Sequence, residues 1–133
     1  MAFHPDIRIL VIDDMMSLRK LIVNNLKEFG FTHITEASNG QDAWAKIKDA
    51  HHAYELIISD WNMPVFSGLQ LLQKCKADEK TKNIPFVMLT AEAEQHQVME
   101  ALKLGVSGYI IKPFTAAILK DKLDQVSQKI TKI

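Results

Sequence analysis

The sequence predicts an α/β protein in which a doubly wound, five-stranded parallel sheet lies between two layers of helices, a three-layer αβα sandwich. Two observations carry this prediction. Short apolar runs alternate five times with segments whose apolar residues recur at helical spacing, and several of the runs are continuously apolar. Continuous apolar runs are typical of parallel strands covered on both faces. Strands and helices that alternate in this way call for right-handed β-α-β crossovers, which put helices on both faces.

The length of the chain fits one domain. It has 133 residues, of which 47% are hydrophobic and 24% charged, a composition ordinary for globular proteins. Area scaling predicts that folding buries about two thirds of the surface of the unfolded chain, enough for a core without disulfides or a structural metal. We therefore expect residues 1–133 to form a single domain.

Charge and cysteine content restrict the kind of partner. The chain has 16 basic and 16 acidic residues, and this neutral balance argues against a sequence-independent nucleic-acid binder. Cys75 is the only cysteine, so no intramolecular disulfide is possible. The sequence has neither an apolar run of the ~20 residues that a membrane span requires nor a secretory signal at its start. We expect a cytoplasmic protein that binds no nucleic acid and no membrane.

In the first half of the chain, the apolar run 7–12 is the first expected strand. A helix is expected between Ser17 and Gly30, and the glycine suits a helix end because it readily adopts the left-handed conformation found there. A second strand is expected at 34–37, followed by a shorter helix. The apolar residues that indicate the two helices are Leu18, Leu21, Ile22, Leu26 and Phe29 in the first and Ala43, Trp44 and Ile47 in the second.

In the second half, strands are expected at 56–59, 86–89 and 108–111, each followed by a helical stripe. The stripe on the fourth helix stops near Gly105. Cys75 lies on the third stripe, so we expect it to be a small core residue. The three stripes consist of Gly68, Leu71, Leu72 and Cys75, then Val98, Ala101 and Leu102, and finally Leu119, Leu123, Val126 and Ile130.

Polar residues follow four of the five expected strands. They are Asp13 and Asp14 after the first strand, Asp60 after the third, Thr90 after the fourth and Lys112 after the fifth. The carboxyl ends of parallel strands share one edge, and ligands of open α/β sheets bind beyond that edge where the strand order reverses. The four segments are therefore expected to converge on one site. The second strand offers no such residue, as expected for a strand at the edge of the sheet.

The residue types at this edge indicate a cation site. Three crowded carboxylates repel each other, so they form either a metal site or an acid site with perturbed pKa values. Oxygen ligands without a paired histidine or cysteine favour Mg²⁺. Taken singly, each residue also has an ordinary interpretation as a helix cap, a turn residue, a strand end or a surface lysine. The combination, not any one residue, indicates the site.

Four motifs contain these residues, and together they resemble the receiver domains of two-component response regulators over essentially the whole chain. The resemblance within that family is strongest to the stand-alone chemotaxis regulators, and it implies a flavodoxin-like fold with strand order 2-1-3-4-5. The motifs are Asp13-Asp14, Asp60-Trp61-Asn62-Met63-Pro64, Thr90-Ala91-Glu92 and Lys112-Pro113-Phe114.

The resemblance implies a phosphorylation-activated signalling switch, not an enzyme with a separate substrate, although such a switch promotes its own phosphoryl transfer and dephosphorylation. It implies that Asp60 accepts a phosphoryl group from a histidine kinase, and that Thr90 and Lys112 bind the phosphoryl oxygens. The Lys112-Pro113 peptide bond is expected to be cis. The residues implied to hold Mg²⁺ are Asp14, Asp60 and the backbone carbonyl of Asn62, with Asp13 reaching the ion through water.

The resemblance also implies that the signal leaves by protein contact. The face of the fourth helix, fifth strand and fifth helix would change on phosphorylation and bind a flagellar motor switch protein. Its residues are Glu92, Met99, Tyr109 and Lys122. The implied partners are a chemotaxis histidine kinase, that motor protein and a phosphatase, and the chain is expected to be a monomer.

Three kinds of alternative remain open. One lies within the receiver class: a stand-alone receiver that acts as a phosphate sink or relay outside motility, or a domain excised from a longer regulator. Another is a hydrolase of the haloacid dehalogenase type, whose second aspartate would stand where this chain has Asn62. A third is a flavin carrier of the same topology, but its phosphate-binding loop would be rich in Ser, Thr and Gly, whereas the first loop here is acidic.

Overall fold

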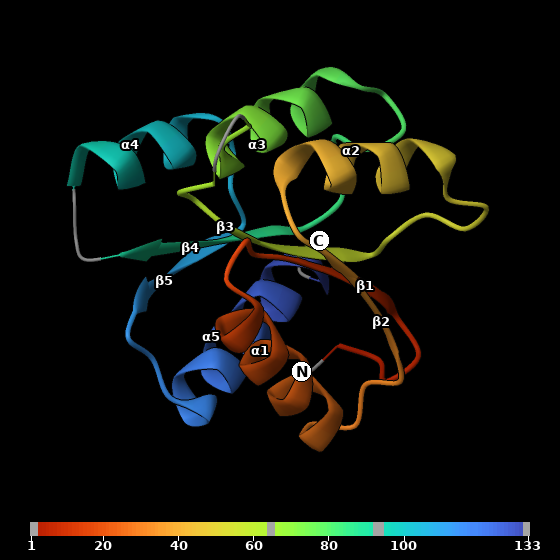
Figure 1. Ribbon diagram of the computed structural model, residues 1–133, viewed down its shortest axis with the longest axis vertical. Helices are drawn as coiled ribbons and strands as arrows, with labels where there is room; N and C mark the ends of the chain where they lie inside the picture. The colour runs from red at the N-terminus through yellow and green to blue at the C-terminus, as the bar shows by residue number, and fades with distance from the viewer. Residues whose placement is uncertain (1–2, 64–65, 92–94, 132–133) are drawn as a thin grey trace.

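A computed structural model of the chain describes residues 3–63, 66–91 and 95–131. Strands and helices alternate along it as predicted, and helices cover both faces of one sheet (Figure 1). The strands are β1 Arg8–Ile12, β2 His33–Ala37, β3 Leu56–Asp60, β4 Phe86–Ala91 and β5 Gly108–Lys112. The helices are α1 Met16–Glu28, α2 Gly40–Asp49, α3 Gly68–Ala77, α4 Gln95–Lys103 and α5 Ala116–Thr131.

The sheet is parallel throughout, with the strand order β2-β1-β3-β4-β5, which confirms the predicted topology and the position of β2 at the edge. Helices α1 and α5 cover one face and α2, α3 and α4 cover the other (Figure 1). From β1 the chain first builds outward to β2 and then returns to β3 on the other side, so the strand order reverses between β1 and β3. Ligand sites of such sheets lie at this reversal.

Successive residues of a strand point to opposite faces of the sheet, so the strands contribute side chains to two hydrophobic cores. Ile9 and Val11 of β1 face α1 and α5, whereas Leu10 and Ile12 face the other helical layer. All of β3 is buried, which explains why its sequence is continuously apolar up to Ser59. Burying one such aliphatic side chain contributes about 1.5–3 kcal/mol, so the central strands anchor the sheet. Cys75 packs in the second core as a free, buried thiol, as predicted.

Two leucines that the helical stripes included are exposed. Leu21 of α1 and Leu102 of α4 lie on helices, as predicted, but their exposed fractions are 47% and 49%, so not every apolar residue that indicated a helix belongs to the core. Successive residues of a helix point about 100° apart, and Leu21 and Leu102 each stand next to a buried residue, Ile22 and Ala101, that already faces the sheet. Apolar character alone does not separate the two neighbours.

The helix ends agree with the glycine signals. Beyond α1, Gly30 has φ +105°, and the Phe31 N–H donates to the carbonyl of Leu26 at 3.1 Å. Gly105, after α4, has φ +86°. Both values lie in the left-handed region that a residue with a Cβ atom seldom adopts. In the part of the chain that the structure describes, no helix is both long and apolar enough to cross a membrane.

Candidate functional site

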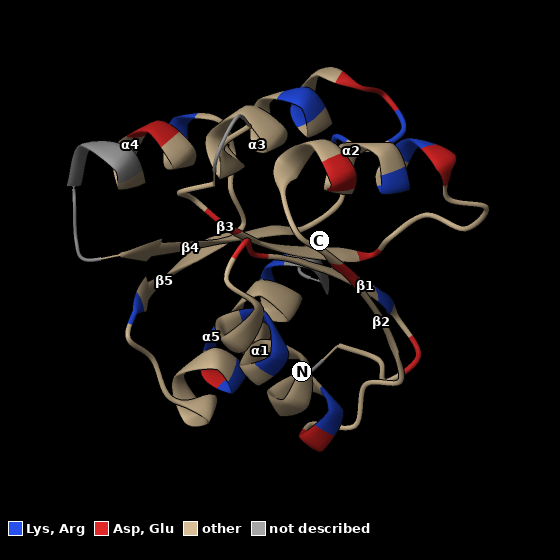
Figure 2. Ribbon diagram, in the orientation of Figure 1, with Lys and Arg blue, Asp and Glu red and all other residues tan. Residues whose placement is uncertain are grey.

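The carboxyl ends of β1 and β3 bring three aspartates together. Asp60 is the last residue of β3, and Asp13 and Asp14 begin the loop that leaves β1. One carboxylate oxygen from each lies within 4.8 Å of the other two. Figure 2 shows these two acidic segments close together, at the end of β3 and at the exit of β1. We call these three residues the acidic group.

The strands reach further than the sequence predicted. Asp60 and Lys112 close β3 and β5 instead of following them, and Thr90 is the next-to-last residue of β4. This extension matters for the site because ladder hydrogen bonds then fix the backbone of these residues. The Trp61 N–H continues the ladder by donating to the Leu89 carbonyl of β4 at 2.9 Å.

Lys112 supplies positive charge to the acidic group from two strands away. Its Nζ donates to Asp60 Oδ1 at 2.8 Å and lies 3.9 Å from Asp13 Oδ2. The Lys112-Pro113 peptide bond is cis, as predicted. Three ionised carboxylates and one ammonium leave an excess of two negative charges, which a divalent cation would neutralise.

Asp13 is the aspartate that the fold isolates from water. Its exposed fraction is 0%, and its Oδ2 is buried with no hydrogen-bond partner among the described residues. Burial, and next the neighbouring charges of Asp60 and Asp14, raise the pKa of Asp13 to about 6, although the Met15 N–H that donates to its Oδ1 acts in the opposite direction. A buried carboxylate oxygen without a partner is costly, so the donor set fits a hard cation such as Mg²⁺.

Thr90 and Asn62 lie at the same sheet edge as Asp60, Thr90 on β4 and Asn62 in the loop that follows β3. Thr90 is buried at the end of β4, the neighbour of β3. Asn62 is exposed in the loop after β3, and this loop is anchored because Trp61 and Met63 on either side of it are buried in the second core. The structure therefore brings Asp13, Asp14, Asp60 and Lys112 into contact distance and places Thr90 and Asn62 at the same sheet edge.

Three of the residues expected on the output face, Met99, Tyr109 and Lys122, lie on α4, β5 and α5, and these elements are on one side of the molecule (Figure 1). Met99 is exposed, and Lys122 Nζ lies 5.4 Å from the centre of the Tyr109 ring, a cation-π contact. Glu92, also expected on this face, lies outside the described residues.

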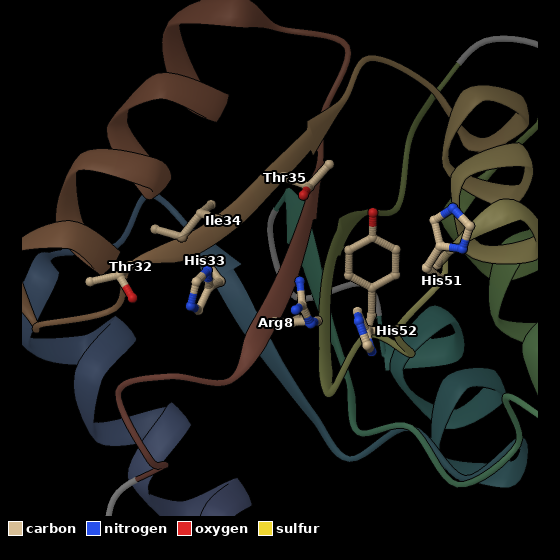
Figure 3. Close-up of a pocket in the computed structure, with 9 residues that line it drawn as sticks. Arg8, Thr32, His33, Ile34, Thr35, His51 and His52 are labelled. Carbon is tan, nitrogen blue, oxygen red and sulfur yellow. The ribbon is translucent and has the colours of Figure 1, made fainter.

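A separate concavity of about 490 Å³ lies at the amino-terminal ends of β1 and β2, far along the strands from the acidic group. Figure 3 shows its side chains, which come from these two strands and from the segment between α2 and β3. They include Arg8, His33, His51, His52 and Tyr54. None of the residues expected at the functional site lines it.

Sequence reasoning missed two side-chain interactions outside the acidic group. Ser67 caps α3: its Oγ accepts the N–H of Gln70, whose side chain in turn accepts the N–H of Ser67. The Ser-x-x-Gln pattern of a capping box was the available signal. Arg19 forms an ion pair with Glu36 and also donates a hydrogen bond to the carbonyl of Asp13. No local sequence pattern indicates a contact between residues so far apart in the chain.

Comparison with known proteins gives one family. The family model described as the response regulator receiver domain matches residues 9–124. The chain is 41% identical over 127 residues to the chemotaxis protein CheY-3 of Vibrio cholerae serotype O1, covering 96% of each chain. It is 44% identical over 119 residues to the chemotaxis protein CheY1 of Helicobacter pylori, covering 90% of this chain and 95% of that one. The solved structure of the chemotaxis response regulator CheY4 of Vibrio cholerae superposes with a TM-score of 0.83 at 30% identity, covering 91% of this chain and 98% of that one.

Proposed function

Because the chain belongs to the response regulator receiver domain family, we propose that it is a phosphorylation-activated switch of a two-component system and that Asp60 is its phosphoryl acceptor. One observation carries the assignment of Asp60: its buried carboxylate lies at the sheet edge with Lys112 at 2.8 Å and the two other aspartates beside it. Such a site can hold a phosphoryl group because charge neutralisation and positioning are what phosphoryl transfer requires.

In the proposed reaction, a carboxylate oxygen of Asp60 attacks the phosphorus of a phosphohistidine on a histidine kinase. The new P–O bond forms as the P–N bond breaks, and the histidine departs with the bonding electron pair and takes up a proton. Lys112 donates to one phosphoryl oxygen and the Thr90 hydroxyl to another. Phosphorylation replaces the single negative charge of the Asp60 carboxylate with about two negative charges. Lys112 and Thr90 would stabilise this additional negative charge.

The acidic group is proposed to hold Mg²⁺ through Asp14, Asp60 and the backbone carbonyl of Asn62, with Asp13 reaching the ion through water. When bound, the ion neutralises the carboxylates and phosphoryl oxygens. The chain resets when water attacks the phosphorus and releases inorganic phosphate, which returns Asp60 to a free carboxylate. We propose that Asn62, which is exposed in the loop directly after Asp60 and Trp61, influences access of that water.

We propose chemotaxis as the process, on the basis that the curated relatives are chemotaxis proteins. The chain would act in the cytoplasm as a monomeric receiver, take its phosphoryl group from a chemotaxis kinase and lose it with the help of a phosphatase. The face with Met99, Tyr109 and Lys122 would then bind a flagellar motor switch protein. Binding of that protein only to the phosphorylated chain supports this output, whereas no binding to either form favours the alternative, a phosphate sink or relay outside motility.

The first test is the intact mass of the chain after incubation with acetyl phosphate. We expect a gain of one phosphoryl group that requires both Mg²⁺ and Asp60, so that chelator or Asp60→Asn abolishes it. Asp49→Asn is the matched control, because Asp49 is an exposed aspartate at the end of α2. A gain that persists in Asp60→Asn, or no gain in the unaltered chain, contradicts the proposal.

A further inference from the structure

Three hydrogen bonds hold Asp13, two of them through its backbone and one through its side chain. Its N–H donates to the carbonyl of Ala37 at the end of β2 (3.2 Å), and its Oδ1 accepts the N–H of Met15 (2.9 Å). Its carbonyl oxygen accepts a hydrogen bond from Nη1 of Arg19 (2.8 Å). These contacts occupy every polar atom of Asp13 except Oδ2, the buried oxygen left for the acidic group. Arg19 is the only side chain from outside the loop among these partners in the described residues.

Arg19 is itself held from the edge strand. Its Nε donates to Glu36 Oε1 of β2 at 2.9 Å, and only 12% of its side chain is exposed. The second oxygen of Glu36 accepts Nζ of Lys20 at 2.8 Å, and Nζ of Lys46 donates to the Glu36 carbonyl at 2.6 Å. Hydrogen bonds from Lys20 and then Arg19 lower the pKa of Glu36, which keeps it ionised. Strand β2 therefore supports the loop of Asp13 through Ala37 and through the pair of Glu36 and Arg19, although β2 contributes no residue to the acidic group.

We propose that Arg19 is a positioning residue for the divalent cation: it holds the loop of Asp13 and Asp14 where the cation needs their carboxylates. This inference rests on the proposed function of the acidic group. The planar guanidinium presents its donors in a fixed fork, so one side chain bridges two acceptors, the Asp13 carbonyl at the exit of β1 and the carboxylate of Glu36 near the end of the edge strand β2. The bonds of Arg19 go to a carbonyl and to Glu36, so its effect on the cation is exerted through the loop.

If Arg19 acted only through its charge, its removal would change the Mg²⁺ affinity in the opposite direction. A positively charged side chain near the three carboxylates repels Mg²⁺, so removal of that charge would strengthen Mg²⁺ binding. Loss of a partner that orients a metal ligand instead weakens metal binding about 10–100-fold. Lys20 provides the matched control, because it carries the same charge on the next residue and bonds the same Glu36, but it is 55% exposed and bonds no atom of Asp13.

The test is calorimetric titration with MgCl₂ of the unaltered chain, Arg19→Met and Lys20→Met. Methionine is a good helix former, so both changes suit α1. We expect Arg19→Met to weaken Mg²⁺ binding about 10-fold or more and Lys20→Met to leave it unchanged or stronger. Glu36→Gln, which retains an acceptor for Arg19, should bind Mg²⁺ normally, whereas Glu36→Ala should bind it more weakly. Thermal unfolding in chelator shows that each variant is folded, and Arg19→Lys, which lacks the fork, replaces Arg19→Met if that variant is not.

Unchanged or tighter Mg²⁺ binding in the Arg19 variant would overturn the positioning role and leave the proposed function intact. An equal loss in Lys20→Met would also overturn it, because the effect would then belong to the charge balance around Glu36. If the unaltered chain binds no Mg²⁺, the proposed function fails and this inference fails with it.

Discussion

Asp13 combines full burial with a carboxyl group, and this makes it sensitive to pH. Its pKa is raised to about 6 from 3.8, so between these values the folded chain binds a proton that the unfolded chain has released. Without metal, the free energy of unfolding should therefore fall as pH rises from about 4 to about 6. A rise in pKa of this size corresponds to about 1–3 kcal/mol.

Asp13→Asn isolates this contribution. The amide has no charge to bury, so the variant should lose this part of the pH dependence and be more stable than the unaltered chain at pH 7 in chelator. Urea unfolding at a series of pH values between 4 and 7 measures it, with Asp49→Asn as the exposed control. A difference between Asp13→Asn and the unaltered chain that is the same at every pH would contradict the assignment.

Gly68, at the start of α3, packs directly against the backbone of Asp60 and Trp61. A Cβ atom there would collide with the carbonyl of Asp60 and press on Sδ of Met88. Gly68→Ala should therefore destabilise the fold by about 1–3 kcal/mol and displace the end of β3. We expect slower phosphorylation by acetyl phosphate, measured by intact mass over time, together with a lower urea midpoint.

Ser67→Ala separates stability from geometry on the same helix. It removes the cap of α3 and should cost about 1 kcal/mol, but Ser67 contacts Gln70 and not Asp60. Its phosphorylation rate should stay near that of the unaltered chain. Similar rates in the two variants would show that the close approach of Gly68 to Asp60 does not matter for the reaction.

The strands and helices differ in how well their bounds and buried faces could be predicted from the sequence. β3 was predictable because burial on both faces makes it continuously apolar. The exact ends of β4 and β5 were not, since Thr90 and Lys112 are polar residues whose place in the ladder depends on neighbouring strands. Likewise, the exposure of Leu21 depends on which face of α1 meets the sheet, and sequence spacing leaves that open within one residue.

The acidic group was predictable for a different reason, namely topology. A parallel sheet places the ends of β1, β3, β4 and β5 on one edge, so four motifs distant in sequence had to meet there. The pairing of Arg19 with Glu36 was not predictable, because it joins the side of α1 to the edge strand through side-chain conformations. Composition shows equal charge, and Figure 2 shows acidic and basic residues mixed over the helices, so many such pairs were conceivable.

Because the acidic group forms only when β1 and β3 pair at the centre of the folded sheet, a cation bound there should stabilise the folded domain. Binding to the folded state alone adds about 2.7 kcal/mol at a cation concentration 100 times the Kd. For a chain of this size, we expect this to raise Tm by roughly 10 °C. Thermal unfolding with MgCl₂ and with chelator measures the shift. Asp14→Asn, which removes a proposed ligand that is exposed and whose loss should not disturb the core, should abolish most of it, whereas Asp49→Asn should retain it. An equal shift in all three proteins would mean that Mg²⁺ acts on the general surface charge, and the acidic group would lose its role as the cation site.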